Sequence, residues 1–120
     1  MINSLEKDVQ TVELEYIAWA CECANWATSE DIKRYSQNFG DSLAKISIFI
    51  EPASDDLILP DTIGYSGDLV RFKGQFYKKK GFPKGYFSWQ DPPKARVFRY
   101  SEYEIIVSNH KEYIKEWGEN

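Results

Sequence analysis

Apolar and polar residues alternate most strictly between Leu69 and Lys78, which predicts a strand with one buried face. Val70, Phe72 and Phe76 share one side of this strand, and charged or amide side chains fall between them. Gly74 occupies an inward position in the same series. A missing side chain at such a position indicates a bulge, a bend or the close approach of another backbone. The pattern therefore favours a strand of a curved sheet.

The segment from Val9 to Cys23 also alternates, but in two opposite phases. Leu14 belongs to the first phase, whereas Ile17 and Cys21 belong to the second, so the register slips by one residue near Tyr16. A bulge in one long strand explains the slip, as in the bent first strand of a small barrel. A helix is the alternative, because Leu14, Ile17 and Cys21 also recur at helical spacing. The strict alternation of the first half favours the strand.

Two short helices are expected, one after the first strand and one at the C-terminus. Thr28 or Ser29 is suited to cap the first helix, and Gly40 is suited to end it. Asn109 is suited to cap the second helix, which runs to Trp117.

Two further extended segments complete the expected sheet, at 46–51 and at 95–107, the second as one or two strands. The spans 53–67 and 78–94 are rich in Gly and Pro and are expected as loops. The first loop carries four apolar residues that could close one end of the core: Leu57, Ile58, Leu59 and Ile63. The core is expected to combine the inward residues Val12, Leu14, Ile48, Ile50, Val70, Phe72, Phe76, Val97 and Ile105.

The extended segments read, in chain order, VELEYIAWACEC, KISIFIEP, DLVRFKGQFY and ARVFRYSEYEIIV. This arrangement, from Thr11 to Val107, resembles the OB-fold, a small closed Greek-key barrel. The predicted fold class is mainly β: a small five-stranded OB-like barrel with a short helix after strand 1 and a short C-terminal helix. Another small barrel or sandwich is the alternative, because 78–94 carries Gly and Pro where the OB-fold commonly places a helix. The resemblance implies a binding module for oligonucleotides, oligosaccharides or protein partners.

Length and composition agree with one small domain. A chain of 120 residues suits a single core, which we expect over 9–120 after a flexible N-terminus at 1–8. The aromatic content of 16% favours β structure, where broad rings pack well. No apolar run is long enough to cross a membrane, and the first residues lack the pattern of a signal peptide. We therefore expect a cytoplasmic protein without membrane contact.

Charge is distributed unevenly along the chain. Residues 71–99 hold nine Lys or Arg and one acid, Asp91, a net charge of +8 against −12 for the rest and −4 overall. Nine aromatic residues lie between Phe72 and Tyr100. Interleaved basic and aromatic side chains are what single-stranded nucleic acid requires, since phosphates need positive charge and bases need stacking surfaces. Core packing of the rings and solvation of a lysine-rich loop explain the same residues without a ligand.

The candidate ligand-binding residues come from this basic aromatic segment: Arg71, Lys73, Tyr77, Lys79, Tyr86, Trp89 and Arg96. We predict a non-enzymatic binding or interaction module for an unknown ligand or protein partner. A single-stranded nucleic-acid binder is one alternative, although a pI near 5.0 disfavours it. An enzyme whose site is not visible in one sequence is the other.

Candidate catalytic and metal-binding residues are few. Cys21 and Cys23 would share one face of a strand, and His110 is the only histidine. Structural zinc needs four ligands, so we expect no metal and two reduced thiols. A Cys–His nucleophile is not favoured, because His110 is expected at the exposed head of the terminal helix. The acid pairs Asp55–Asp56 and Glu102–Glu104 are expected on solvated surfaces, and no phosphate-binding loop or cofactor motif is present.

Overall fold

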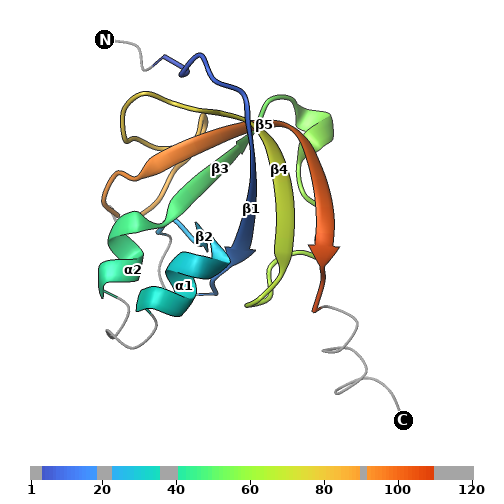
Figure 1. Ribbon diagram of the computed structural model, residues 1–120. Helices are drawn as coiled ribbons and strands as arrows, with labels where there is room; N and C mark the ends of the chain where they lie inside the picture. Colours follow the sequence, from blue (N-terminus) through green and yellow to red (C-terminus); the bar gives the residue numbers. More distant parts are fainter. Residues whose placement is uncertain (1–3, 19–22, 36–40, 90–91, 110–120) are drawn as a thin grey trace.

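The chain folds into a closed barrel of five strands. The computed structural model describes residues 4–18, 23–35, 41–89 and 92–109 (Figure 1). The strand order is β1-β2-β3-β5-β4, with β4 paired back to β1, and all pairings are antiparallel except that of β3 with β5. The predicted mainly β barrel is thus confirmed, and its order is compatible with an OB-like topology. The elements are β1 (Gln10–Tyr16), β2 (Trp26–Ala27), α1 (Ser29–Tyr35), α2 (Asp41–Ile46), β3 (Ile48–Pro52), η1 (Asp55–Leu57), β4 (Leu69–Phe76) and β5 (Arg96–Val107).

Strand β4 follows the predicted alternation, with Val70, Phe72 and Phe76 buried inside the barrel. Gly74 lies where the pairing with β5 shifts its register. A Cβ atom at this glycine would stand 2.0 Å from the carbonyl oxygen of Arg99, so no side chain fits there. The predicted close approach of another backbone is confirmed.

Strand β5 is one continuous strand that bends across the barrel, pairing first with β3 and then with β4 (Figure 1). Phe98 and Tyr100 point into the main core. Val97 instead packs on the outer side of the wall, in a second cluster with Phe49. Ile105 is 37% exposed, so the predicted inward positions of Val97 and Ile105 are wrong. Alternation failed here because both faces of the first half of β5 are covered, while its far end projects beyond the core.

The first strand is shorter than predicted. Strand β1 ends at Tyr16, and the N–H of Ile17 donates to the carbonyl of Asn25 at 2.8 Å. The chain has therefore turned back, and Trp26 begins β2 antiparallel to β1. The end of β1 at Tyr16 and the pairing of Ile17 with Asn25 replace the bulge that the sequence suggested for the phase slip, and residues 19–22 lie outside the described residues. The buried Trp26 side chain is a core residue that the sequence analysis missed.

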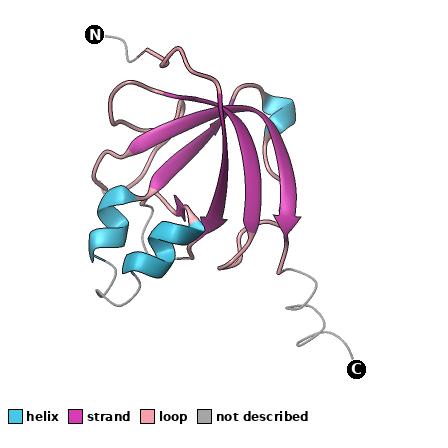
Figure 2. Cartoon of the chain, viewed as in Figure 1, coloured by secondary structure: helices cyan, strands magenta, loops and turns pink. Residues whose placement is uncertain are grey.

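Helix α1 starts as predicted, because the Thr28 hydroxyl oxygen accepts the N–H of Asp31 at 3.1 Å. The expected stop at Gly40 lies outside the described residues. Helix α2 was not predicted, and it takes Ile46 out of the expected strand. The terminal helix predicted over 109–117 lies outside the described residues except for Asn109. Figure 2 shows α1 and α2 at one end of the barrel and η1 at the opposite end.

One main core fills the barrel. Seven of the predicted core residues belong to it or pack against it: Val12, Leu14, Ile48, Ile50, Val70, Phe72 and Phe76. Three residues of the loop at 53–67 also pack against it as expected, namely Leu57, Leu59 and Ile63. Ile58 does not, since it is 61% exposed.

Candidate functional site

Strand β2 has the shortest strand pairings of the barrel. This strand pairs with β1 over two residues and with β3 through the single pair Trp26–Ile48. Strand β4, in contrast, pairs along its whole length with β5 and over most of it with β1. We call the boundary between the β1–β2 hairpin and residues 49–52 of β3 the seam.

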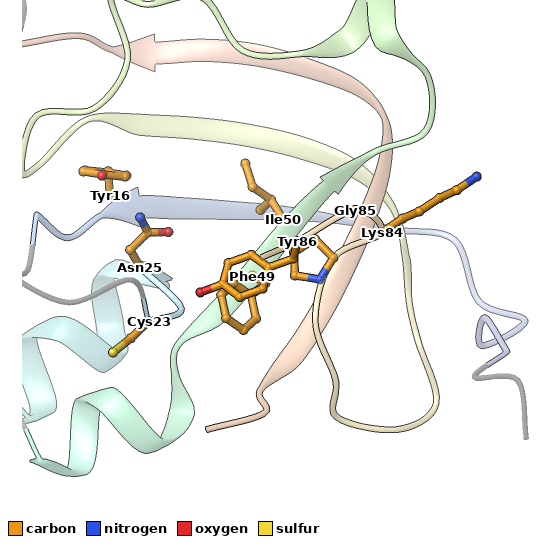
Figure 3. Close-up of a pocket in the computed structure, with 9 residues that line it drawn as sticks. Tyr16, Cys23, Asn25, Phe49, Ile50, Lys84, Gly85 and Tyr86 are labelled. Atoms are coloured by element: carbon orange, nitrogen blue, oxygen red, sulfur yellow. The ribbon is translucent and has the colours of Figure 1, made fainter. Parts of the chain in front are cut away.

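A hollow of about 520 Å³ lies over the seam (Figure 3). The hairpin supplies one side of it, β3 supplies the floor, and the β4–β5 loop supplies the roof. In Figure 3 the Lys84 side chain extends away from the other lining residues. The lining residues of this seam hollow are Tyr16, Cys23, Asn25, Phe49, Ile50, Pro83, Lys84, Gly85 and Tyr86.

Aromatic packing holds the roof in place. The rings of Phe49 and Tyr86 lie 5.1 Å apart, and Phe82 stacks on Tyr86 at 5.2 Å with nearly parallel planes. Tyr86 and Tyr77 also pack against the buried cluster that includes Val97. Offset ring pairs of this kind stabilise beyond the area they bury. The seam hollow therefore has a fixed aromatic wall.

The buried carboxylate of Glu51 ties the same loop to β3. Its Oε1 accepts the backbone N–H of Lys84 at 2.7 Å, and its Oε2 accepts the hydroxyl of Tyr77 at 2.5 Å. The Nε of Arg99 lies 3.7 Å from the same Oε2. Burial, together with the bond to Glu51, raises the pKa of Tyr77 to about 12, so its phenol stays protonated as a donor. Glu51 thus anchors the beginning and the middle of the loop.

Two of the predicted site residues lie on the outer face of β4, away from the seam hollow. The guanidinium of Arg71 contacts Glu13 at 2.7 Å and Glu104 at 2.9 Å. The amine of Lys73 lies 3.6 Å from Glu102. Neighbouring carboxylates therefore offset the positive charge of this face.

The other predicted residues are spread around the barrel. The Arg96 guanidinium lies 3.8 Å from the centre of the Phe76 ring, at the end that carries α1 and α2. Lys79 and Trp89 are exposed residues of the β4–β5 loop. Only Tyr86 lines the seam hollow, and Tyr77 reaches its neighbourhood through Glu51. The seven residues do not form one continuous site.

The sequence analysis missed Tyr16, Asn25, Phe49 and Glu51. Phe49 carried a usable signal, because it is a large apolar residue in the polar phase of its strand. Glu51 reads as an ordinary outward acid, and only the tertiary structure shows that a loop covers it. Tyr16 and Asn25 meet because the hairpin closes, which the sequence pattern did not predict.

Cys23 is disulfide-bonded, so the expectation of reduced thiols is wrong for this residue. The expectation assumed a strand through both cysteines, whereas Cys23 lies in a bend. Cys21 and His110 lie outside the described residues. Among the residues that are described, no three His, Cys, Asp or Glu side chains gather as metal ligands, and no helix is long and apolar enough to cross a membrane. Comparison with protein-family models, curated proteins and solved structures finds no match to this chain.

Proposed function

We propose that this chain is a non-enzymatic binding module that holds its ligand in the seam hollow. The observation that carries the proposal is the convergence of the hairpin, β3 and the β4–β5 loop around one recess lined by aromatic rings. Recesses with mainly aromatic and apolar walls and a few placed polar groups are the usual form of ligand sites. Asn25 supplies such a polar group here.

The OB-like assignment belongs to the same proposal. In OB-folds the face of strands 2 and 3 binds ligands together with the loops between strands 1 and 2 and between strands 4 and 5. The lining of the seam hollow draws on the connection between β1 and β2, on β3 and on the β4–β5 loop, which supports this assignment. The helices, however, fall between β2 and β3, ahead of the third strand. The fold therefore supports a binding role. The ligand class has to be inferred from the residues that line the hollow.

Ligand titrations followed by amide NMR shifts test the proposal. We expect a ligand of this module to move the signals of Asn25, Phe49 and Tyr86 together. Tyr86→Ala should weaken binding by removing the roof ring, whereas Tyr103→Ala, on the opposite wall, should leave it unchanged. Shifts confined to the outer face of β4 would contradict the proposal.

A single-stranded nucleic-acid binder is the second candidate, and one observation favours it. Trp89 is 89% exposed, and its ring lies 5.0 Å from that of Phe87 in a T-shaped contact, on a loop that carries Lys78–Lys80. Phosphate contacts should weaken steeply with salt, while base stacking should persist.

A titration of labelled oligothymidine at two salt concentrations tests this candidate, with Lys79→Glu and Trp89→Ala as variants. Undetectable binding at low salt eliminates it. Tight binding that Trp89→Ala abolishes, with no shift at Asn25 or Phe49, would move the site from the seam hollow to the loop.

A further inference from the structure

Basic side chains gather around two adjoining hollows at the end of the barrel that carries α1 and α2 (Figure 2). Lys45, Lys80 and Arg96 line the larger hollow, which has a volume of about 440 Å³. Lys45, Lys80 and Lys94 line the smaller one, of about 270 Å³. We call the two together the basic end hollow, because they share Lys45 and Lys80. The smaller part also shares Cys23 with the seam hollow, so the two regions are neighbours.

Backbone pairing brings the lysines of the β4–β5 loop to Arg96. The N–H of Tyr77 donates to the carbonyl of Val97 at 3.0 Å, and Gly81 and Ala95 exchange two hydrogen bonds of 2.8 and 3.1 Å. Residues 78–80, all lysines, therefore lie opposite the single residue Arg96. Like charges at opposing positions of paired strands repel each other. An anion bound between Lys80 and Arg96 would relieve this repulsion.

The Arg96 side chain is supported from the core. Its guanidinium lies 3.8 Å from the centre of the Phe76 ring, and Phe76 is a buried residue of the main core. A guanidinium that stacks on a ring through one face keeps its N–H groups in its own plane, where they can bind two oxygens of a phosphate. Arg96 is thus held in place by a contact that leaves these donors available.

Positive charge dominates the lining of the basic end hollow. Asp31 is the one acid among its described lining residues, which leaves a net charge of +3. Within the part of the chain that the structure describes, none of the four cations forms an ion pair. Arg71 and Lys73, on the outer face of β4, are paired with acids instead. The charge of the basic end hollow is therefore open to a ligand.

We propose that the basic end hollow binds the phosphate group of a small phosphorylated molecule. Arg96 supplies a planar set of donors, and Lys45 and Lys80 supply point charges beside it. Tyr35 lines the same larger hollow and offers a ring to the remainder of the molecule. This site is additional to the seam hollow and does not rest on the proposed function.

Size and charge favour a small molecule over a nucleic-acid strand. Volumes of about 440 and 270 Å³ are in the range of sites for molecules as large as a nucleotide. The residues outside 71–99 carry a net charge of −12. Their repulsion acts on every phosphate of a long polyanion, whereas a single phosphate group in the hollow lies next to the cations.

The test is a titration followed by amide NMR shifts, in a phosphate-free buffer of low ionic strength. The probes are inorganic phosphate, pyrophosphate and thymidine monophosphate, with thymidine as the matched molecule that lacks the phosphate. We expect pyrophosphate and thymidine monophosphate to shift the amides of Lys80 and Arg96, and thymidine to leave them unchanged. Added sodium chloride should weaken the binding, because it screens the cations.

Variants identify the cations that bind. Arg96→Gln and Lys80→Gln should each weaken pyrophosphate binding about tenfold or more, the effect of one lost charge-assisted hydrogen bond. Lys73→Gln removes the same charge from the outer face of β4 and should change the affinity by less than about twofold. Circular dichroism establishes that each variant is folded. Lys80 is exposed, so its substitution tests the site even if Arg96→Gln disturbs the packing on Phe76.

Four results would overturn the inference. The first is that no phosphate probe shifts Lys80 or Arg96 at low salt. The second is that Lys73→Gln weakens binding as much as Lys80→Gln does, since general charge would then be responsible. The third is that thymidine binds as well as its monophosphate. The fourth is that oligothymidine binds here while pyrophosphate and thymidine monophosphate do not, because the ligand would then be a strand.

The same spectra separate this site from the seam hollow. Shifts at Asn25, Phe49 and Tyr86 report on the seam hollow, and shifts at Lys80 and Arg96 report on the basic end hollow. If the phosphate probes shift the first group and not the second, the inference is wrong and the proposed function stands.

Discussion

The barrel has two unlike walls. In the β4 wall, made of β1, β4 and β5, ladders run along nearly the full length of the strands. At the seam, β2 offers two residues to β1 and a single pair to β3. Long ladders and a packed inner face stabilise the first wall, whereas the short pairings of β2 border the seam hollow in the second. Under the proposed function, this small barrel separates folding from recognition by shortening one strand.

The charged residues of the β4 wall and of the seam also differ in how they are paired. On the outer face of the β4 wall, Arg71 and Lys73 pair with exposed acids, and such pairs contribute little to stability. Beside the seam, Glu51 is only 5% exposed, and each of its oxygens accepts a directed hydrogen bond. A buried carboxylate is retained only where its bonds are satisfied. The loop over the seam is therefore placed by specific contacts.

The largest expected effect lies in the β4 wall. Phe72 is fully buried, and its ring lies 4.8 Å from Tyr100 and 5.3 Å from Trp26. Phe72→Ala should lower the free energy of unfolding by about 3–5 kcal/mol in urea denaturation. Ile50→Val at the seam should cost only about 0.5–1.5 kcal/mol. A loss below about 1 kcal/mol for Phe72→Ala would contradict its place in the core.

The second-largest expected effect on stability is at Asp68, which is fully buried just before β4 begins. Its Oδ2 accepts the N–H groups of Gly64 and Tyr65 at 2.9 Å each, and its Oδ1 accepts the N–H of Asn109 at 2.7 Å. Asp68→Asn replaces one acceptor oxygen by a donor and leaves at least one of these groups unsatisfied. We expect a loss of about 1–3 kcal/mol in urea denaturation. Asp61→Asn, at an exposed position, is the matched control, and a similar loss there would show that general charge is responsible.

The sequence predicts the β4 wall better than the seam, because the two depend on contacts of different range along the chain. The β4 wall was predicted well, because alternation and the inward Gly74 are local signals of a buried, curved strand. The position of Val97 was predicted wrongly, because a strand that is covered on both faces shows no alternation of apolar and polar residues. The seam was not predicted, since it depends on where the hairpin of Ile17 and Asn25 turns and on how the loop closes over Glu51. The contacts of Glu51 with Tyr77 and Lys84 join residues far apart in the chain, and no local pattern encodes them.

A high-pH titration compares Tyr100, in the core of the β4 wall, with Tyr77, in the loop over the seam. Burial raises the pKa of Tyr100, in the core of the β4 wall, to about 12, and burial with the bond to Glu51 does the same for Tyr77. Both values exceed the ordinary value of about 10 of the unfolded chain. The stabilisation that these neutral phenols provide is therefore complete below about pH 10 and lost as the pH rises toward 12.

Tyrosinate absorbance measures this effect. We expect Tyr77 and Tyr100 to ionise late, and Tyr77→Phe to remove the Tyr77 transition while the core remains folded. If Tyr77 ionises near pH 10, like an exposed tyrosine, Glu51 does not hold the loop as described.

The smallest expected effect is at Trp89, the most exposed large hydrophobic side chain among the described residues. Because this ring is 89% exposed, Trp89→Ala should change the free energy of unfolding by no more than about 0.5 kcal/mol. The buried Trp26, which contacts Phe72 and Tyr16, is the contrast, and Trp26→Ala should cost about 3–5 kcal/mol. Fluorescence reports on Trp89, since the emission that Trp89→Ala removes should be that of a solvent-exposed indole. A loss above about 1 kcal/mol for Trp89→Ala would mean that this ring packs on the barrel, and the loop would then be part of the folded wall and unavailable as a stacking surface.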